Sequence, residues 1–331
     1  MAGGAGQMGI NYYSDPHVRA RMLEFAGGGC ADRLTCRFLT SADLTGARGC
    51  VRRRPAELAR LWDEGGELHR SLWDRKALIA HLGVEYVNFD SPAEPYLDPE
   101  RVLHLIHHVD WAVEAVLLDY GIRPLHLLVG PAHHFVWRVR RASPVFAELA
   151  SLGRPAVPSQ RRYSPPRTRG LDEVAAEWAA AHVGLGRVVE YVAHRVRELA
   201  ELVGEVPAEL SVTESGPARH EPEGVSIDLS AYSDPLHGRT LCLPFSLYLQ
   251  PWRRGLLNCG TDPARLRPMF AVPVLGMQPR EGLEIPRDPA RVLSLARHAE
   301  TRIPDQSKGT EHLLAAYRES DWYGFHAWFY S

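Results

Sequence analysis

Three short stretches of the chain carry side chains that can bind a metal ion or a phosphate group. The first, "VEYVNFDSP" at residues 84–92, alternates like a strand and carries Asn88 and Asp90 just before a Ser-Pro break. Successive side chains of a strand point to opposite faces, so Asn88 and Asp90 share a face with Tyr86. Carboxylate and amide oxygens are ligands for hard divalent cations. The stretch therefore predicts a cation site at a strand end, with a neutral amide where a second acid is expected.

The other two stretches add an imidazole and a further acid. "GPAHHFVWRV" at residues 130–139 places His134 on a predicted strand, with Arg138 on the same face. "VSIDLS" at residues 225–230 places Asp228 on a strand whose other face is apolar. A half-buried acid is costly unless a cation or hydrogen bonds compensate it, and imidazole and guanidinium groups bind phosphates. Together the stretches predict a Mg²⁺ or Mn²⁺ site beside a nucleotide.

The order of these stretches resembles the archaeo-eukaryotic primase superfamily, which includes primase-polymerases. "YVNFD", a long helix, "GPAHHFVW" and "SIDLSAYSDPLHGRTLCLPFSLYLQPW" are similar to its three motifs, over roughly residues 70–255. The resemblance implies an α+β fold, in which an RRM-like mixed or antiparallel sheet carries an attached α/β subdomain. It also implies nucleotidyl transfer to a 3′-hydroxyl on a nucleic-acid template, with nucleoside triphosphates as substrates.

The resemblance also implies a role for each matching residue. Asp90 and Asp228 would be catalytic acids that hold Mg²⁺ or Mn²⁺, with Asn88 as a neutral third ligand. The residues that would bind the incoming triphosphate are His134, Arg239 and Ser246. Strand alternation, rather than the resemblance, adds Arg138, which shares the face of His134 and is placed to reach the same phosphates. Two-metal phosphoryl transfer relies on shared carboxylates to neutralise the ions, and an Asn brings no charge. Either one metal suffices here, or the fold is kept while polymerase activity is reduced or lost.

Three functions are therefore compatible with these residues. The first is a metal-dependent nucleotidyltransferase of primase-polymerase type. The second is a catalytically weakened or inactive relative that binds nucleotide or nucleic acid. Asn88 favours it, as does Pro131, which has no N–H to offer a phosphate. The third is a metal-dependent phosphodiesterase built on the same kind of sheet.

Composition limits the partners. The chain has 331 residues, 45% hydrophobic and 24% charged, with a formal net charge of −2, so no overall basic field attracts nucleic acid. Binding of nucleic acid would need a local patch. The arginines available for one are Arg161, Arg162, Arg167, Arg169, Arg253 and Arg254. The chain shows neither a signal-peptide pattern nor an apolar run of about 20 residues, so we expect a cytoplasmic protein without a membrane partner.

Other clusters have simpler explanations. Cys30, Cys36 and Cys50 offer three zinc ligands, but no CxxC pair is present, and buried free thiols are the favoured interpretation. The three histidines of the long helix share one face and offer a metal site or a partly exposed surface. They are His104, His107 and His108. The closing aromatic residues, 322–330, are expected to dock the tail on the body.

The elements that must position these side chains follow from caps and periodicity. Helices are predicted in residues 14–27, 52–66 and 71–83, and a long helix in residues 97–121 has Asp98 as its cap and Pro99 at its first position. A hairpin with its turn at "GPAH" follows. A further helix is expected to break near Gly184 and Gly186.

We expect three regions along the chain. An N-terminal α/β unit spans residues 1–75 and packs on a catalytic core at residues 76–260. The core contains a Pro- and Arg-rich connection at residues 151–170 and a helical insertion at residues 171–204. A helical tail at residues 261–331 completes the chain.

Overall fold

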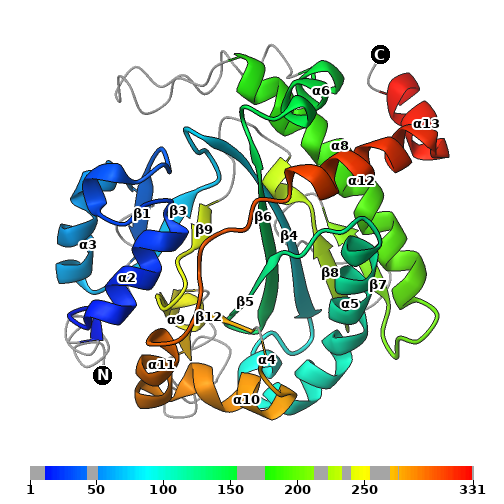
Figure 1. Cartoon of the computed structure of the whole chain (residues 1–331). Coiled ribbons are helices and arrows are strands. Elements are labelled where there is room, and N and C mark those ends of the chain that lie inside the picture. Colours follow the sequence, from blue (N-terminus) through cyan, green and yellow to red (C-terminus); the bar gives the residue numbers. More distant parts are fainter. Residues whose placement is uncertain are drawn as a thin grey trace.

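The computed structural model describes residues 12–42, 51–154, 176–211, 223–232, 240–253, 269–274 and 276–329. Its centre is a six-stranded sheet in the order β12-β5-β6-β4-β8-β7 (Figure 1). The strands of this sheet are β4 (Ala77–Asn88), β5 (Leu125–Val129), β6 (Ala132–Arg140), β7 (Ala208–Ser211), β8 (Glu223–Asp228) and β12 (Val272–Pro273). Neighbouring strands are antiparallel except β7 and β8, which are parallel. The fold is therefore mixed α+β, as expected.

Helices cover one face of the central sheet. The two longest are α5 (Pro99–Asp119) and α8 (Ala176–Ala200), and α6 (Pro144–Leu152) and α12 (Ser307–Glu319) pack beside α8. The apolar face of α5, which includes Val102, Val109 and Val116, is buried against the sheet in one hydrophobic cluster. The spacing of these residues is that of one helical face, so burial of this stripe positions the helix.

The opposite face of the sheet packs against a second unit. A four-stranded sheet in the order β2-β1-β3-β9 forms this unit with α2 (Pro16–Phe25), and a separate hydrophobic cluster fills the interface. Its strands are β1 (Leu39–Ala42), β2 (Val51–Arg53), β3 (Glu67–Ser71) and β9 (Thr240–Cys242). The N-terminal sheet is thus completed by a strand from much later in the chain.

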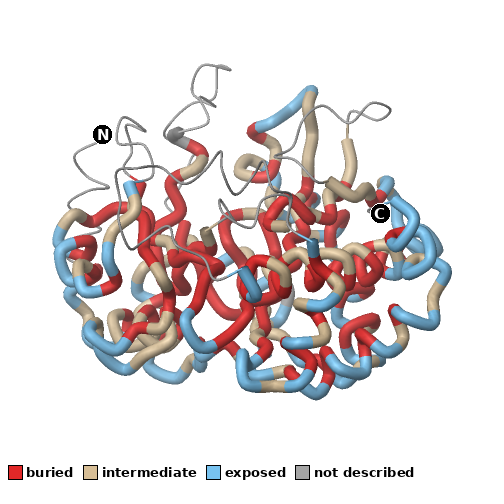
Figure 2. The backbone as a smooth tube through the Cα atoms, turned by 90° about the horizontal axis from the view of Figure 1, so that it is seen from above, coloured by how far each residue is buried: buried red, intermediate tan, exposed pale blue. Residues whose placement is uncertain are grey.

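Short elements connect these layers. Near the N-terminal sheet lie η1 (Ala31–Arg33), η2 (Pro55–Glu57), α3 (Leu58–Glu64), β10 (Leu247–Tyr248), α9 (Gln250–Arg253) and β11 (Met269–Phe270). The others are α4 (Glu94–Leu97), η3 (Ser230–Tyr232), α10 (Pro279–Glu284), η6 (Ile285–Arg287), α11 (Pro289–Ala296) and α13 (Asp321–Phe329). Figure 2 shows buried backbone running through the middle of the molecule, with exposed segments around the periphery. None of the described helices is both long and apolar enough to span a bilayer.

Local signals placed several elements correctly. Asp15 caps α2 through hydrogen bonds from the backbone N–H groups of His17 and Val18, and Asp98 caps α5. The hairpin is β5 and β6, and Gly130 at its turn has a φ of 62°. That left-handed conformation suits glycine, because it has no Cβ to clash with the backbone.

The helix predicted over residues 71–83 is wrong, because residues 77–83 begin strand β4. Ala77, Leu78, Ile79, Ala80 and Leu82 are all buried, so both faces of this part of the strand are covered. A strand covered on both faces loses its apolar-polar alternation and reads as a continuous apolar run. Alanine and leucine then favour helix by propensity, and sheet pairing overrides it.

The predicted break in α8 is also wrong, because the helix runs unbroken through its two glycines. A Cβ on Gly184 would lie 2.0 Å from the carbonyl oxygen of Leu149 on α6. A Cβ on Gly186 would lie 2.9 Å from the Cβ of Tyr232. These glycines therefore permit close packing of neighbouring backbones rather than a bend.

The C-terminal helix α13 docks by one side. His326 is buried and its Nδ1 lies 2.9 Å from the Tyr317 hydroxyl, while Trp322 stacks on His194 with ring centroids 3.7 Å apart. Trp328 and Phe329 remain 73% and 61% exposed. The predicted docking of the aromatic tail is therefore confirmed only for its inner side.

Substitution of Gly184 by Ala tests the close approach of α6 and α8. We expect a loss of about 2–4 kcal/mol in unfolding free energy, because a methyl group would overlap the Leu149 carbonyl in a packed core. Gly324→Ala in α13 is the matched control, since a Cβ there meets nothing within 4 Å and should stabilise by about 0.5–1 kcal/mol. Urea unfolding measures both, and equal stability of the two variants would contradict this packing.

Candidate functional site

Asp228 and His134 lie on either side of one glycine at the centre of the sheet. Gly83 of β4 pairs with Asp228 of β8 on one edge and with His134 of β6 on the other. Directly paired residues in a sheet present side chains to the same face. A Cβ on Gly83 would lie 3.4 Å from the Cβ of Asp228 and 3.4 Å from Cε1 of His81. The missing side chain thus leaves room for an acid and two imidazoles, and the structure brings Asp228 and His134 together.

A second histidine supports His134. The Nε2 of His81 lies 2.7 Å from the Nδ1 of His134, and the rings are stacked with centroids 4.9 Å apart. The Tyr232 hydroxyl accepts from the N–H of His81 and donates to its carbonyl, both at 2.9 Å. Burial raises the pKa of Tyr232, so the hydroxyl keeps its proton for this bond. The pair of imidazoles is therefore held in place from the backbone.

Asn88 and Asp90 lie elsewhere. Asn88 is five residues beyond Gly83 on β4, about 16 Å away at 3.3 Å per residue, and it pairs with Glu223. The odd number of steps also places Asn88 on the opposite face of the sheet from Asp228. Asp90 follows the end of the strand. The structure does not bring the predicted ligands Asn88 and Asp90 to Asp228, because strand parity and distance separate them.

Asn88 instead belongs to a hydrogen-bonded network at the strand end. Its side-chain oxygen accepts from the backbone N–H groups of Asp90 and Ser91, at 3.0 and 2.8 Å. Its side-chain nitrogen donates to Glu94 at 2.6 Å, and Arg101 also reaches Glu94. Position 88 therefore needs one acceptor and one donor, which an amide supplies and a carboxylate does not.

Glu94 and Glu223 are the acids of this network. Arg101 bridges them, with its guanidinium nitrogens 2.5 Å from Glu94 and 2.6 Å from Glu223. Although burial acts in the opposite direction, hydrogen bonds from Tyr86 and Asn88 and the charge of Arg101 lower the pKa of Glu94. A carboxylate at position 88 would add a third negative charge to one bridging arginine.

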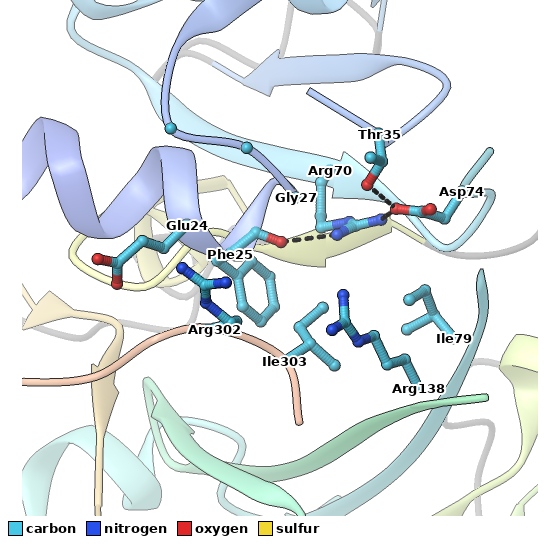
Figure 3. Close-up of a pocket in the computed structure, with 12 residues that line it drawn as sticks. Glu24, Phe25, Gly27, Thr35, Arg70, Asp74, Ile79, Arg138, Arg302 and Ile303 are labelled. Carbon is cyan, nitrogen blue, oxygen red and sulfur yellow. Dashed lines mark hydrogen bonds and ion pairs between the residues drawn. The ribbon is translucent and has the colours of Figure 1, made fainter. Parts of the chain in front are cut away.

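A cavity opens farther along the same face as His134. It has a volume of about 120 Å³ and lies between the end of α2, the N-terminal sheet and β4–β6 (Figure 3). Ile79 and Arg138, a directly paired couple on β4 and β6, form its floor. Arg302, from the segment before α12, lies at its side.

The charges lining this cavity are unevenly paired. Arg70 bonds to Asp74 at 2.8 Å, and Glu24 pairs outside the lining with Arg21 at 2.9 Å. Neither Arg138 nor Arg302 forms an ion pair with a residue that the structure describes. The Nε of Arg138 is buried and has no hydrogen-bond partner among the described residues. The cavity therefore carries an excess of positive charge.

Of the remaining predicted nucleotide ligands, Ser246 is the one that the structure describes, and it does not line this cavity. Ser246 is fully buried in the second unit, where its hydroxyl accepts from the backbone N–H of Leu68 at 2.7 Å. Ser246 therefore stabilises the fold of this unit rather than contacting a nucleotide. Arg239, Arg254, Cys50 and the arginines at 161–169 lie outside the described residues.

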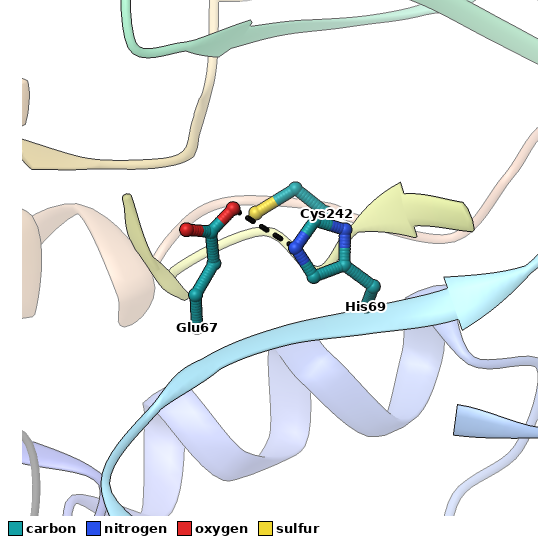
Figure 4. A group of neighbouring side chains, drawn as sticks. All are labelled: Glu67, His69 and Cys242. Carbon is teal, nitrogen blue, oxygen red and sulfur yellow. Dashed lines mark hydrogen bonds and ion pairs between the residues drawn. The ribbon is translucent and has the colours of Figure 1, made fainter. Parts of the chain in front are cut away.

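Two groups of described residues place three ligand atoms within 4.8 Å of one another and so can hold a metal ion. They are Glu67, His69 and Cys242 (Figure 4), and Asp110, His126 and His133. Neither group contains Asp90, Asp228 or Asn88, and neither contains Cys30, Cys36 or the histidines at 104, 107 and 108. The geometry of these two groups is compatible with a metal ion, at positions that the sequence analysis did not single out.

The sequence interpretation missed three residues of this face. His81 was assigned to a helix, and Glu85 was passed over because the cation site was placed on the face of Asn88 and Asp90. Glu85 pairs with Ser226 and shares the face of Asp228. Extending strand alternation backward through "HLGVE" would have found both. Arg302 carries no local signal, because only folding brings it to the cavity.

Comparison with known proteins finds no matching family model, no matching curated protein and no matching solved structure.

The network around Asn88 generates a prediction about Asn88→Asp. We expect the change to lower the unfolding free energy at pH 7 by about 1–2 kcal/mol, because it replaces a donor to Glu94 by a like charge. Urea denaturation measures the effect. The matched control is Asp90→Asn, which is expected to change stability by no more than about 0.5 kcal/mol at an exposed position. Stability of Asn88→Asp equal to the parent would contradict this role.

Proposed function

We propose that this chain binds a nucleotide through its phosphates, in the cavity between α2 and the central sheet. The proposal corresponds to the second function compatible with the sequence, a primase-like protein that binds nucleotide or nucleic acid. The observation that carries it is the pair Arg138 and Arg302, two cations in one lining that have no acidic partner among the described residues. Guanidinium groups bind phosphate oxygens with paired, charge-assisted hydrogen bonds.

The size of the cavity indicates which part of the ligand it can hold. Pockets for whole small molecules measure about 300–1,000 Å³. At about 120 Å³, this cavity accommodates a phosphate group rather than a whole nucleotide. The rest of the ligand would lie along the sheet face outside it.

The sheet face offers a path for that remainder. From Arg138, strand β6 leads to His134 four residues away, a distance of about 13 Å. His81 and Asp228 lie beside His134. A ligand held by its terminal phosphate at Arg138 would extend toward these groups, where imidazoles donate to phosphate or sugar oxygens.

The primase-type architecture remains part of this proposal. The antiparallel core of the central sheet and the two helices on one face are compatible with the RRM-like sheet that the resemblance implies. Nucleic acid as a partner is likewise a proposal. It rests on the order of the motifs.

Titration with ATP tests the cavity. We expect the parent chain to bind ATP, and Arg138→Gln and Arg302→Gln each to weaken binding at least tenfold, because each removes a phosphate cation. Isothermal titration calorimetry at constant salt measures the affinity. Arg280→Gln is the control, since it removes an equal charge at a side chain that is 87% exposed and away from the cavity. Equal affinity in all four proteins, or no binding by the parent, would exclude this site.

A second candidate is metal-dependent nucleotidyl transfer with a different acid pair. Glu85 pairs with Ser226 while Asp228 pairs with Gly83, so the two acids are diagonal neighbours on one face. Diagonal neighbours in a sheet are about 7–8 Å apart at their backbones, which lets two carboxylates reach one cation. Mg²⁺ or Mn²⁺ would neutralise them and polarise a bound phosphate.

Primer extension with Mn²⁺ distinguishes the two acid pairs. If the chain incorporates nucleotides, Glu85→Gln and Asp228→Asn should each reduce the rate at least a hundredfold, and Asp90→Asn should leave it unchanged. Loss of activity in Asp90→Asn alone would restore the assignment made from the sequence. Cleavage of the labelled primer in the same gel would instead indicate the phosphodiesterase.

A further inference from the structure

A second cluster of histidines and acids lies on the helix-covered side of the central sheet. His126 of β5 and His133 of β6 face α5, which contributes Asp110 and Glu114 one turn apart. The Nε2 of His126 lies 2.8 Å from the Nδ1 of His133, and that Nδ1 lies 3.0 Å from Oδ2 of Asp110. The Nδ1 of His126 lies 3.1 Å from Oε1 of Glu114.

The protons available do not satisfy these contacts. The contact with Glu114 requires a proton on Nδ1 of His126, because a carboxylate only accepts. A single proton on Nδ1 of His133 can then be directed to Asp110 or to His126, but not fully to both. If Nε2 of His126 also carried a proton, the outcome would depend on Nδ1 of His133. With a proton on that Nδ1, two N–H groups would point at each other; without one, the carboxylate of Asp110 would face a nitrogen lone pair. In each protonation state one contact lacks its hydrogen bond.

Asp110 adds a separate observation. Its side chain is 8% exposed, and its Oδ1 is buried without a hydrogen-bond partner among the described residues. A buried carboxylate oxygen without a partner is costly, with a penalty of about 1–3 kcal/mol or more for a charged group. Nε2 of His126, Nδ1 of His133 and Oδ2 of Asp110 therefore converge on one small volume, beside a carboxylate oxygen that has no partner among the described residues.

The other ligand group differs in this respect. In the cluster of Glu67, His69 and Cys242, one oxygen of Glu67 lies 2.9 Å from Nε2 of His69. The other accepts from the backbone N–H of Leu249 at 2.8 Å. Both oxygens of Glu67 thus have protein donors, so this cluster leaves no carboxylate oxygen unpaired, although Nδ1 of His69 is buried without a partner among the described residues.

We propose that Asp110, His126 and His133 bind a zinc ion, with Glu114 orienting His126. Two imidazole nitrogens and one carboxylate oxygen suit Zn²⁺ and disfavour Mg²⁺ or Ca²⁺, which prefer oxygen ligands. Ligands at about 2.1 Å in a tetrahedron are about 3.4 Å apart, so the observed separations need to open by only a few tenths of an ångström. A carboxylate that receives the other N–H of a metal-bound histidine is a common support for such sites.

This site is independent of the proposed nucleotide site. His133 and His134 are neighbours on β6 and point to opposite faces of the sheet. The ion would tie α5 to the hairpin of β5 and β6, on the side away from Arg138. Its role is therefore to hold the scaffold, and its occupancy leaves the binding of ATP unaffected.

Zinc binding to the full chain tests the proposal. Protein stripped with a chelator is dialysed against Zn²⁺, and the bound metal is measured by mass spectrometry. We expect one zinc per chain in the parent and in Cys242→Ser, together with a higher melting temperature than for the stripped protein. Asp110→Asn and His126→Gln should each lose at least tenfold in affinity and lose the thermal shift. Glu114→Gln should weaken binding by about 10–100-fold.

Cobalt provides a second readout that does not depend on how well each variant folds. Co²⁺ bound to nitrogen and oxygen ligands shows visible d–d bands without the charge-transfer band of a thiolate, and the parent should show this spectrum. Circular dichroism verifies that at least one of the two ligand variants is folded. No zinc in the parent would overturn the proposal. So would zinc that survives both variants, or a Co²⁺ spectrum with a thiolate charge-transfer band that disappears in Cys242→Ser.

Discussion

Strand β4 is the constraint on which the rest of the structure depends. It is hydrogen-bonded to β6 on one edge and to β8 on the other, and residues 77–84 are buried on both faces. Burying each large aliphatic side chain there contributes about 1.5–3 kcal/mol, and a polar group left without a partner costs about 1–3 kcal/mol. These side chains are shielded from water, apart from Ile79, which lines the cavity. His81 is therefore bonded to His134, and Gly83 leaves space for both rings beside Asp228.

The same geometry divides the polar chemistry of the molecule into two separate places. His133 and His134 are adjacent in sequence, yet one meets Asp110 beneath α5 and the other meets His81 on the opposite face. The helix-covered side is dry and packed, which favours an ion that completes unsatisfied ligands. The other side leads to a cavity with excess positive charge, which favours an anion. A structural ion and a phosphorylated ligand would therefore bind on opposite faces of the same sheet and would share no residues.

The amide at position 88 acquires a different explanation from the one suggested by the motif. If Asn88 were a degenerate metal ligand, it would stand where a metal-binding acid has been replaced. In the structure it joins two backbone N–H groups to Glu94, and Arg101 links that carboxylate to Glu223. The network secures the end of β4 to the start of α5. The hydrogen bonds at this strand end therefore explain the amide at position 88 without reference to catalysis.

The sequence by itself determined the elements with local signals: Asp98 caps the long helix α5, and Gly130 lies at the turn of the hairpin. It also paired Asp228 with His134 through the order of the motifs. It did not reveal strand β4 before residue 84, because burial on both faces erases alternation. Tertiary structure alone decided which face each acid occupies, since a shift of one residue in a strand reverses its side chains. It alone brought Arg302 to Arg138 and α5 to His133, because contacts between distant segments depend on packing and register, which no local pattern encodes.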